Sequence, residues 1–342
     1  MHALSKSHAV NQNNKIGGKP KRGFMSDRAI VTRAGRPLNA TAVLLMLMLC
    51  LSWGFNQISV KLALPDIPPL TQAAIRSFGG LLVILAIARI RGVEIFRRDG
   101  TLWAGIFAGV LFGFEFVLIY IGLTMTTASR AVVFLYVAPF VVALGSKRFL
   151  GERLSSLQWS GMALSFAGVA LAIGVPQPFV DAKVILGDLL VVGGGVLWAA
   201  TTLIVKSTKL LQAPAEKTLA YQVAVSVPIL AIGALVTGER MTHMPGAVAM
   251  LSMVYQTFWV VGITFLIWFF LIRTFSASKL SSFTFITPLF GVIGGYFIMH
   301  DSLTLAFAGA ALLVMAGLYL VNHLVNRPNE ASGDPLLPVT KT

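Results

Sequence analysis

The sequence predicts an all-α integral membrane protein with ten transmembrane helices in two inverted five-helix repeats. Three observations lead to this prediction: long apolar runs, an uneven distribution of basic residues, and an internal repeat. Of the 342 residues, 56% are hydrophobic and only 12% are charged. Because soluble domains have about 25% charged residues, most of this chain is expected to lie in lipid or against other helices.

Ten apolar runs of about 20 residues are long enough to cross a bilayer as helices. Prolines interrupt the chain between some of these runs, such as Pro65, Pro68 and Pro69 after the first run and Pro176 after the fifth, and prolines at such places mark turns. The expected spans are 40–63, 69–89, 101–122, 128–147, 156–174, 184–205, 218–237, 249–272, 278–299 and 303–323.

Two tails flank the spans. The expected organisation is a tail at 1–39, a first repeat at 40–174, a second repeat at 184–323 and a tail at 324–342. The first tail is polar and basic, which predicts a disordered cytoplasmic segment. It does not resemble a secretory signal peptide, because its apolar run begins near Ala40 and fills a whole span. Met25 offers an alternative to Met1 as the translation start.

The lysines and arginines predict the orientation of the chain. Ten spans place both termini on one side of the membrane, and all but five of the 27 Lys and Arg residues fall in the tails and loops of that side. The exceptions are Lys61, Arg76, Arg130, Lys183 and Arg240. The positive-inside rule therefore puts both termini in the cytoplasm of a multi-pass protein of the bacterial inner (plasma) membrane. The same rule explains the net charge of +14, so no nucleic-acid partner is expected.

Several classes of protein do not fit the residues inside the spans. The single cysteine, Cys50, permits no intrachain disulfide. The five histidines lie in the tails or at span ends, and the spans contain no catalytic constellation. We therefore expect no enzyme, no catalytic residues, no metal and no cofactor. A channel would need a ring of polar or charged side chains, which the lone intramembrane acid Glu115 does not supply.

The two halves of the sequence repeat at a near-constant offset. An offset of 149 residues pairs Pro139 with Pro288, and an offset of 145 residues pairs Trp53 with Trp198. The other pairs are Ser129 with Ser278, Gly145 with Gly294, Glu152 with Asp301, Gly168 with Gly317, and Lys61 with Lys206. Each half has five spans, an odd number, so the second half must insert upside down relative to the first. Inverted repeats are typical of alternating-access transporters, and a duplicated scaffold is the alternative.

These landmarks resemble the EamA-type families of the drug/metabolite transporter superfamily. The first span contains Trp53-Gly54-Phe55-Asn56 and reaches Lys61, which is similar to the family's opening Trp-Gly-x-Asn…Lys. The later similar segments are Pro68-Pro69 before Arg76, Ala128 to Leu154 with Gly151-Glu152-Arg153-Leu154, Gly187-Asp188 with Trp198, and Phe283 to Leu289. One motif differs from the family pattern: the second Gly-Glu-x-Leu reads His300-Asp301-Ser302-Leu303. We expect this change to affect helix ends.

The resemblance covers residues 40–323, nearly the whole chain outside the tails. It implies ten helices, cytoplasmic termini, and export or exchange of metabolites such as amino acids.

Glu115 and Arg76 are the charged residues expected well inside the spans. A charge at the bilayer centre costs about 3 kcal/mol on insertion scales, so both side chains must face the bundle interior. At about 1.5 Å per residue they lie at similar depth and can pair. Two roles stay open: a structural ion pair, or a place in the transport path. In the path, Glu115 either takes up a proton or anchors a cationic group of the solute.

Polar and aromatic residues complete the predicted substrate cavity. Asn56 and Gln57 lie at a similar level in the first span, and the repeat maps them to Thr201 and Thr202. Such buried groups need partners, so they either serve the polar end of a solute or bond across helices. The predicted aromatic lining is Trp53, Phe112, Tyr120, Tyr136, Trp198, Tyr221, Tyr255 and Trp259, with ordinary packing as the alternative for each. Pro139 and Pro288 free backbone carbonyls that either flex a gate or contact a solute.

Together these observations predict a transporter that exports or exchanges amino acids or similar amphipathic or aromatic solutes by alternating access. The alternatives are multidrug or toxic-compound efflux and a membrane scaffold that transports nothing. The expected partners are a small-molecule substrate and the lipid bilayer. Proton coupling is left open, as is the choice between a monomer and a homodimer.

Overall fold

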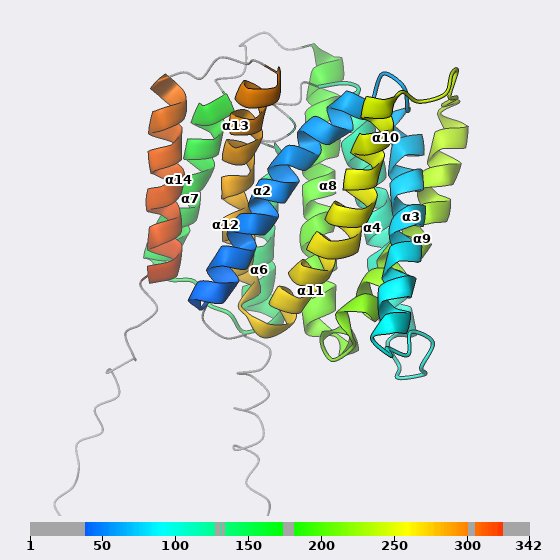
Figure 1. The fold of residues 1–342 in the computed structure, drawn as a ribbon. Coiled ribbons are helices and arrows are strands. Elements are labelled where there is room, and N and C mark those ends of the chain that lie inside the picture. Colours follow the sequence, from blue (N-terminus) through cyan, green and yellow to red (C-terminus); the bar gives the residue numbers. More distant parts are fainter. Residues whose placement is uncertain (1–37, 127–130, 132–133, 174–180, 300–304, 324–342) are drawn as a thin grey trace, which may run out of the picture.

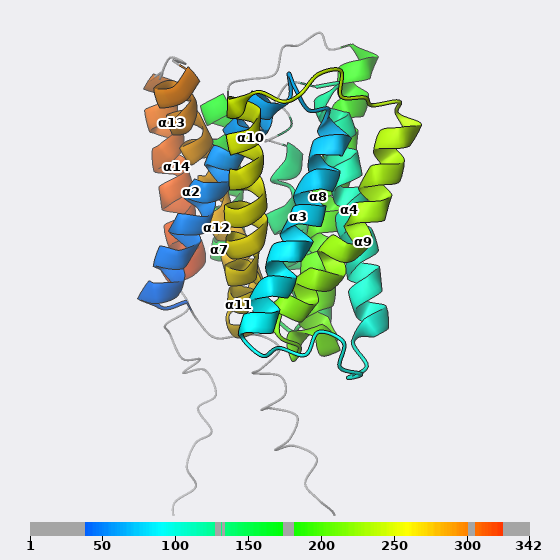
Figure 2. The same ribbon diagram turned by 45° about the vertical axis from the view of Figure 1, so that its right-hand side comes forward.

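The computed structural model describes residues 38–126, 131, 134–173, 181–299 and 305–323, and over these residues the fold is all-helical. The helices run roughly side by side in one bundle (Figures 1 and 2). Both predicted tails lie outside the described residues, except for the last two positions of the first tail. Ser129, Arg130 and Asp301 lie outside them as well.

The helices follow one another with short connections. In chain order they are α2 (Ala40–Ala63), α3 (Pro69–Ile90), α4 (Leu102–Leu123), α6 (Ala138–Phe149), α7 (Ser156–Ile173), α8 (Ala182–Ser207), α9 (Ala215–Val236), α10 (Ala247–Val254), α11 (Phe265–Thr274), α12 (Ala277–Phe283), α13 (Thr287–Met299) and α14 (Leu305–His323). A short 3-10 helix, η1 (Lys209–Leu211), follows α8. A π-helical segment, η2 (Tyr255–Thr264), joins α10 to α11, and a 3-10 turn, η3 (Thr284–Ile286), joins α12 to α13.

Seven helical segments among the described residues are long and apolar enough to cross a membrane. They are Ala40–Ala63, Pro69–Ile90, Leu102–Leu123, Ala182–Ser207, Ala215–Val236, Ala247–Thr274 and Ala277–Ile298. Their ends lie within a few residues of the expected spans. Large apolar side chains such as Phe107, Leu189 and Leu312 are exposed on these and neighbouring helices, as expected where a helix faces lipid. The prediction of an all-helical protein with several spans is confirmed, and the full count of ten stays a prediction.

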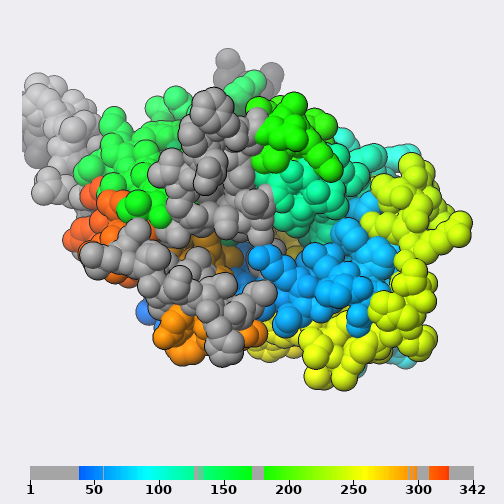
Figure 3. Space-filling view, turned by 90° about the horizontal axis from the view of Figure 1, so that it is seen from above, coloured from blue at the N-terminus to red at the C-terminus, as the bar shows by residue number. Residues whose placement is uncertain are grey.

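The two ends of the bundle differ in which connections they hold. The helix α2 begins and α14 ends at the lower end in Figure 1, where the α3–α4, α8–α9 and α11–α12 connections also lie. We call this end the terminal side. The α2–α3 and α9–α10 connections lie at the opposite side, which Figure 3 views directly.

Contacts between the two halves hold the opposite side together. Glu239, after α9, accepts hydrogen bonds from the backbone amides of Leu70 at 3.0 Å and Thr71 at 2.7 Å, the first turn of α3. Asp66 accepts a hydrogen bond from the Gly246 amide at 2.7 Å. This amide, with the His243 side chain, holds the pKa of Asp66 below its usual range. A carboxylate at a helix N-terminus satisfies amides that have no partner within the helix.

Small residues allow several helices to pack with their backbones close together. Gly105, Gly109 and Gly113 of α4 face α9, and a Cβ atom added at Gly109 would lie 2.8 Å from the carbonyl oxygen of Tyr221. These three glycines, spaced by four residues, therefore mediate a close helix contact within the bundle. Between α7 and α14, an added Cβ at Gly317 would lie 2.3 Å from the carbonyl oxygen of Gly161, so this helix pair also packs through its backbones.

A buried lysine ties the α3–α4 connection to the start of α9 on the terminal side. The Lys217 side chain is 1% exposed, and its Nζ donates hydrogen bonds to the Arg97 carbonyl oxygen at 2.5 Å and to Asp99 Oδ2 at 2.8 Å. The hydrogen bonds from Lys217 and Thr101 hold the pKa of Asp99 well below its usual range. Ionised Asp99 therefore stabilises the folded protein.

Replacing Asp99 with asparagine is expected to lower the stability of the protein by about 1–2 kcal/mol, because a buried ammonium group loses its anionic partner. Since folding lowers the pKa of Asp99, the wild-type contribution is present above the unfolded value near pH 4 and is lost as pH falls through the folded value. Thermal unfolding of the purified protein against pH measures both effects. The exposed Glu94→Gln variant in the same connection is the control, and an equal loss in both variants would contradict the assignment.

Candidate functional site

A cavity of about 160 Å³ lies at the centre of the bundle, between helices from both halves of the chain. It extends to Leu123, the last residue of α4, and so reaches toward the opposite side. The lining residues are Trp53, Asn56, Val60, Arg76, Phe112, Glu115, Phe116, Ile119, Tyr120, Leu123, Leu135, Tyr136, Trp198, Thr201, Thr202, Gln222, Val260, Phe265, Trp268, Phe269 and Thr287. The wall is therefore mostly apolar and aromatic, with a few polar groups, as is typical of small-molecule sites.

Several polar atoms of this cavity are buried and have no protein partner among the described residues. Arg76 is 2% exposed, Glu115 6% and Gln222 0%. Among the described residues, no hydrogen-bond partner is present for Arg76 Nε and NH2, Glu115 Oε2, both amide atoms of Gln222 or Asn56 Oδ1. A buried polar atom without a partner costs about 1–3 kcal/mol. Several such atoms around one cavity therefore favour water or another polar molecule inside it.

Arg76 and Glu115 both line the cavity but do not form the direct pair that their similar depth suggested. The Arg76 guanidinium carbon lies 4.3 Å from the centroid of the Phe116 ring, a cation–π distance. No ion pair or hydrogen bond joins the guanidinium to the Glu115 carboxylate. Stacking on Phe116 holds the guanidinium in place instead, so both charged groups remain available to a solute.

Aromatic rings pack against one another on the terminal side of the cavity. Trp53 of α2 and Trp198 of α8, the repeat-related pair, both contact Trp268 of α11, with ring centroids 5.5 and 6.1 Å apart. The indole Nε1 of Trp53 donates a hydrogen bond to Thr264 Oγ1 at 3.0 Å. The ring of Phe112 packs edge-on against Phe116 at 4.9 Å. These rings form a rigid apolar surface next to the polar groups.

The structure brings ten of the predicted site residues together. Those that line the cavity are Trp53, Asn56, Arg76, Phe112, Glu115, Tyr120, Tyr136, Trp198, Thr201 and Thr202. The side chain of Gln57 lies outside the described part of the structure.

Three predicted aromatic residues lie elsewhere. Tyr221 packs against Gly105 between α4 and α9. Tyr255 and Trp259 donate hydrogen bonds to Ser52, at its carbonyl oxygen and its hydroxyl, both at 2.9 Å. These two side chains connect η2 to α2 and do not line the cavity. The sequence could not tell whether these three residues pack between helices or line the cavity, because either role requires a buried aromatic residue.

Gln222 is the main cavity residue that sequence reasoning missed. It lies on α9 between Thr218 and Ser226, and all three are buried. Residues spaced by four lie on one face of a helix, so this polar stripe in an otherwise apolar span was a usable signal. Phe265, Phe269 and Thr287 were also missed, and nothing in their local sequence sets them apart from other span residues.

The two predicted helix-breaking prolines follow breaks in their helices. Tyr136 and Val137 form a turn immediately before α6, in which Pro139 occupies the first turn. The 3-10 turn η3 immediately precedes Thr287 and Pro288 of α13. Tyr136 and Thr287, beside these breaks, line the cavity. The irregular backbone therefore lies next to the cavity, where such geometry is tolerated in a membrane protein.

These features define a multi-pass membrane protein that encloses a partly polar central cavity. The chain belongs to the EamA-like transporter family, whose profile matches residues 40–174 and 185–323. The resemblance drawn from the motifs is thereby confirmed, and the protein is placed among membrane transporters. A transporter family also agrees with the expectation that the chain is not an enzyme.

Several relatives share most of their length with this chain. The uncharacterized transporter YvbV of Bacillus subtilis (strain 168) is 29% identical over 294 residues, covering 84% of this chain and 92% of YvbV. Proteins described as probable amino-acid metabolite efflux pumps in Salmonella typhimurium and Escherichia coli are 27% and 26% identical, covering 81% of this chain and 93% of theirs. A crystal structure with 20% identity has a TM-score of 0.71, covering 84% of this chain and 98% of the other, which shows a shared fold.

Proposed function

We propose that this protein exports or exchanges small zwitterionic solutes with an apolar or aromatic body, such as amino acids, by alternating access. The observation that carries the proposal is the set of buried polar atoms without partners in an aromatic cavity. Arg76 offers a cation, Glu115 an anion, and Gln222 an amide. A solute with a carboxylate and an ammonium group would pair with Arg76 and Glu115 at once. Hydrogen bonds between oppositely charged groups are the strongest kind in proteins.

The rings of the cavity suit the remainder of such a solute. Phe112, Phe116 and Tyr120 follow one another on α4 beside Glu115, and Trp53 and Trp198 face them from α2 and α8. Apolar and aromatic groups gain free energy on leaving water for such a surface. The names of the Salmonella and Escherichia relatives, which refer to amino-acid metabolites, agree with this class of solute.

The proposed cycle needs two equivalent inverted halves, and the packing of α7 against α14 supports this arrangement. Gly168 of α7 packs against Ala310 and Val314 of α14, and Gly317 of α14 packs against Gly161 and Ser165 of α7. The repeat offset of 149 residues relates Gly168 to Gly317, Gly161 to Ala310 and Ser165 to Val314. The second contact is therefore the first one with the two helices exchanged. Such exchanged contacts are what a two-fold axis between the helices produces. The ring of Tyr136 also packs against that of its repeat partner Phe285 at 6.0 Å.

Orientation and coupling complete the proposal. The basic residues favour ten spans with both termini in the cytoplasm, so that the cavity reaches toward the periplasmic side. Glu115 is the one acid among the cavity-lining residues and is the proposed proton carrier if transport is coupled to protons. Either a monomer or a homodimer is compatible with a cavity formed within one chain.

A series of three related solutes tests the proposed substrate class. L-phenylalanine carries both charged groups, phenethylamine lacks the carboxylate, and 3-phenylpropionate lacks the amine. In proteoliposomes, counterflow of labelled L-phenylalanine is expected to be competed at least tenfold better by the zwitterion than by either analogue, because each analogue leaves one buried charge without a partner.

The outcomes separate the competing functions. Equal competition by phenethylamine would contradict the need for a carboxylate and favour efflux of amphipathic cations, as in multidrug efflux. No counterflow and no thermal stabilisation by any amino acid or cationic drug would favour a scaffold that transports nothing.

A further inference from the structure

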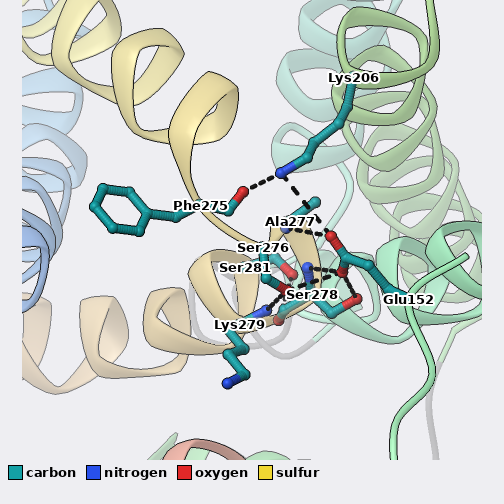
Figure 4. Close-up of polar contacts among 8 residues, drawn as sticks. All are labelled: Glu152, Lys206, Phe275, Ser276, Ala277, Ser278, Lys279 and Ser281. Carbon is teal, nitrogen blue, oxygen red and sulfur yellow. Dashed lines mark hydrogen bonds and ion pairs between the residues drawn. The ribbon is translucent and has the colours of Figure 1, made fainter. Parts of the chain in front are cut away.

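A buried polar cluster on the terminal side joins the two halves of the chain (Figure 4). Its centre is Glu152, in the connection after α6. Oε1 of this carboxylate accepts a hydrogen bond from the Ala277 amide at 3.0 Å. Oε2 accepts bonds from the Ser278 amide at 3.1 Å, the Ser278 hydroxyl at 2.7 Å and the Ser276 hydroxyl at 2.9 Å. A residue of the first half thus caps the N-terminus of α12, in the second half.

Lys206, in the last turn of α8, completes this cluster. Its Nζ lies 3.9 Å from Glu152 Oε1 and donates a hydrogen bond to the Phe275 carbonyl oxygen. The side chains of Lys206 and Glu152 are 0% and 6% exposed. We call Glu152, Lys206 and residues 275–278 the terminal latch. It ties together the α6–α7 connection, the end of α8 and the start of α12.

The terminal latch lies directly beyond the aromatic end of the cavity. Lys206 follows the cavity residue Trp198 by two turns of α8, which is about 12 Å. Phe275 follows the cavity residues Trp268 and Phe269 by a similar interval along α11. At its other end the cavity extends to Leu123, the end of α4. A solute that left the cavity along α8 and α11 toward the terminal side would therefore have to pass the latch.

The repeat partner of Lys206 is in a different environment. Lys61 lies eight residues after Trp53 on α2, as Lys206 lies eight residues after Trp198 on α8. Lys61 is exposed at the opposite side, whereas Lys206 is fully buried. If the halves are inverted copies, equivalent lysines at the two ends of the protein lie in two different environments, while Asp301 and Ser129, the partners of Glu152 and Ser278, lie outside the described residues. This difference is what one conformation of an alternating-access cycle requires.

The chemistry of the terminal latch also suits a contact that must open and close. A carboxylate, an ammonium group and a helix N-terminus attract one another strongly when water is excluded. The same groups are well solvated in water, so hydration offsets the lost contacts when that end opens. Two packed arrangements with a small free-energy difference are typical of elements that switch.

We propose that the terminal latch is the gate that closes the terminal side of the transport path, and that Glu152 and Lys206 hold it shut in this conformation. The gate rests on the proposed alternating-access function. Its release would expose the cavity to the terminal side, and its closure would accompany opening at the opposite side. Glu152 and Lys206 act through helix position and do not contact the solute.

The test measures how fast a cysteine in the cavity reacts with a membrane-impermeant maleimide applied to the terminal side. Cys50→Ala removes the single native cysteine, and Thr202→Cys places the reporter in the cavity. A separate protein with Arg98→Cys, in the exposed α3–α4 connection, identifies vesicles that present the terminal side to the reagent. This control shows which side of the protein the reagent reaches, whatever the orientation of the protein in the cell.

Glu152→Gln and Lys206→Met are each expected to raise the labelling rate at least fivefold over the parent. The matched Lys61→Met variant should leave the rate from this side within twofold of the parent. Ser278→Ala removes one hydrogen bond to Glu152 and should give a two- to threefold rise, which provides a readout if Lys206→Met does not fold.

Two results would overturn the gate. Labelling rates equal to the parent in Glu152→Gln and Ser278→Ala would leave the cluster as a structural cap of α12. An equal rise in Lys61→Met would mean that general loosening explains the labelling. Labelling is measured without solute, so its result does not depend on the substrate. If the L-phenylalanine series shows no preference for the zwitterion, the proposed substrate class is overturned, while the labelling rates still test the gate. Transport with unchanged labelling in the latch variants would overturn the gate alone.

Discussion

Replacing Glu115 with glutamine is expected to lower transport of a zwitterionic solute by about 10–100-fold while the amount of folded protein in the membrane stays normal. The substitution keeps the shape of the side chain and removes its charge. A hydrogen bond to a charged group contributes about 1.5–3 kcal/mol, and each 1.4 kcal/mol corresponds to a factor of ten. The carboxylate has no partner at Oε2 among the residues that the structure describes, so folding should not depend on its charge.

Initial rates of counterflow in proteoliposomes, measured across a range of pH, give this result. Glu94→Gln, which removes an exposed acid from the α3–α4 connection, is the matched control and should transport at the wild-type rate. If Glu115 carries a proton, the variant also loses the pH dependence of the wild type; if Glu115 only anchors the solute, the pH dependence remains.

Two outcomes would contradict a place for Glu115 in the transport path. Wild-type rates at every pH would show that the carboxylate is dispensable. Loss of folded protein in Glu115→Gln, restored by adding Arg76→Gln, would favour a structural ion pair. The structure speaks against the latter, because Arg76 stacks on Phe116 and forms no ion pair with Glu115.

Replacing Gly317 with alanine is expected to destabilise the protein by about 3 kcal/mol, at the upper end of the range for overpacking. The new Cβ would lie 2.3 Å from the Gly161 carbonyl oxygen and 2.7 Å from the Ser165 amide nitrogen. Both atoms belong to the backbone of α7 and cannot rotate away. The two helices would have to separate along their whole contact, which loses packing at many other atoms.

Gly309→Ala on the same helix is the matched control. The nearest atom to its added Cβ is the Leu171 Cδ2 atom at 3.9 Å, an ordinary contact. Alanine favours a helix over glycine by about 1 kcal/mol, so this variant should be as stable as the wild type or more stable. Thermal unfolding in detergent, followed by size-exclusion chromatography, compares the two. Equal midpoints for both variants would show that α7 and α14 do not pack as closely as described.

The sequence alone determined the class of the protein and the ends of most of its helices. Apolar runs of span length leave few other folds, because the backbone must satisfy its own hydrogen bonds in lipid. The motifs from Trp53 to Leu289 sufficed to identify the family, and the uniqueness of Glu115 and Arg76 inside the spans indicated that they face the interior. Each of these inferences depends on local composition or on order along the chain.

Only the tertiary structure decided which residues meet. Depth along a helix placed Arg76 beside Glu115, but the direction of each side chain depends on how α3, α4 and α9 pack, and the guanidinium lies on Phe116 instead. The same packing turns Gln222 into the cavity and Tyr255 toward Ser52. In the sequence, Glu152 appeared only in a repeat pair and in the Gly-Glu-x-Leu motif, and Lys206 only in a repeat pair. Their contact joins positions 54 residues apart in different halves, and no local pattern encodes such a contact.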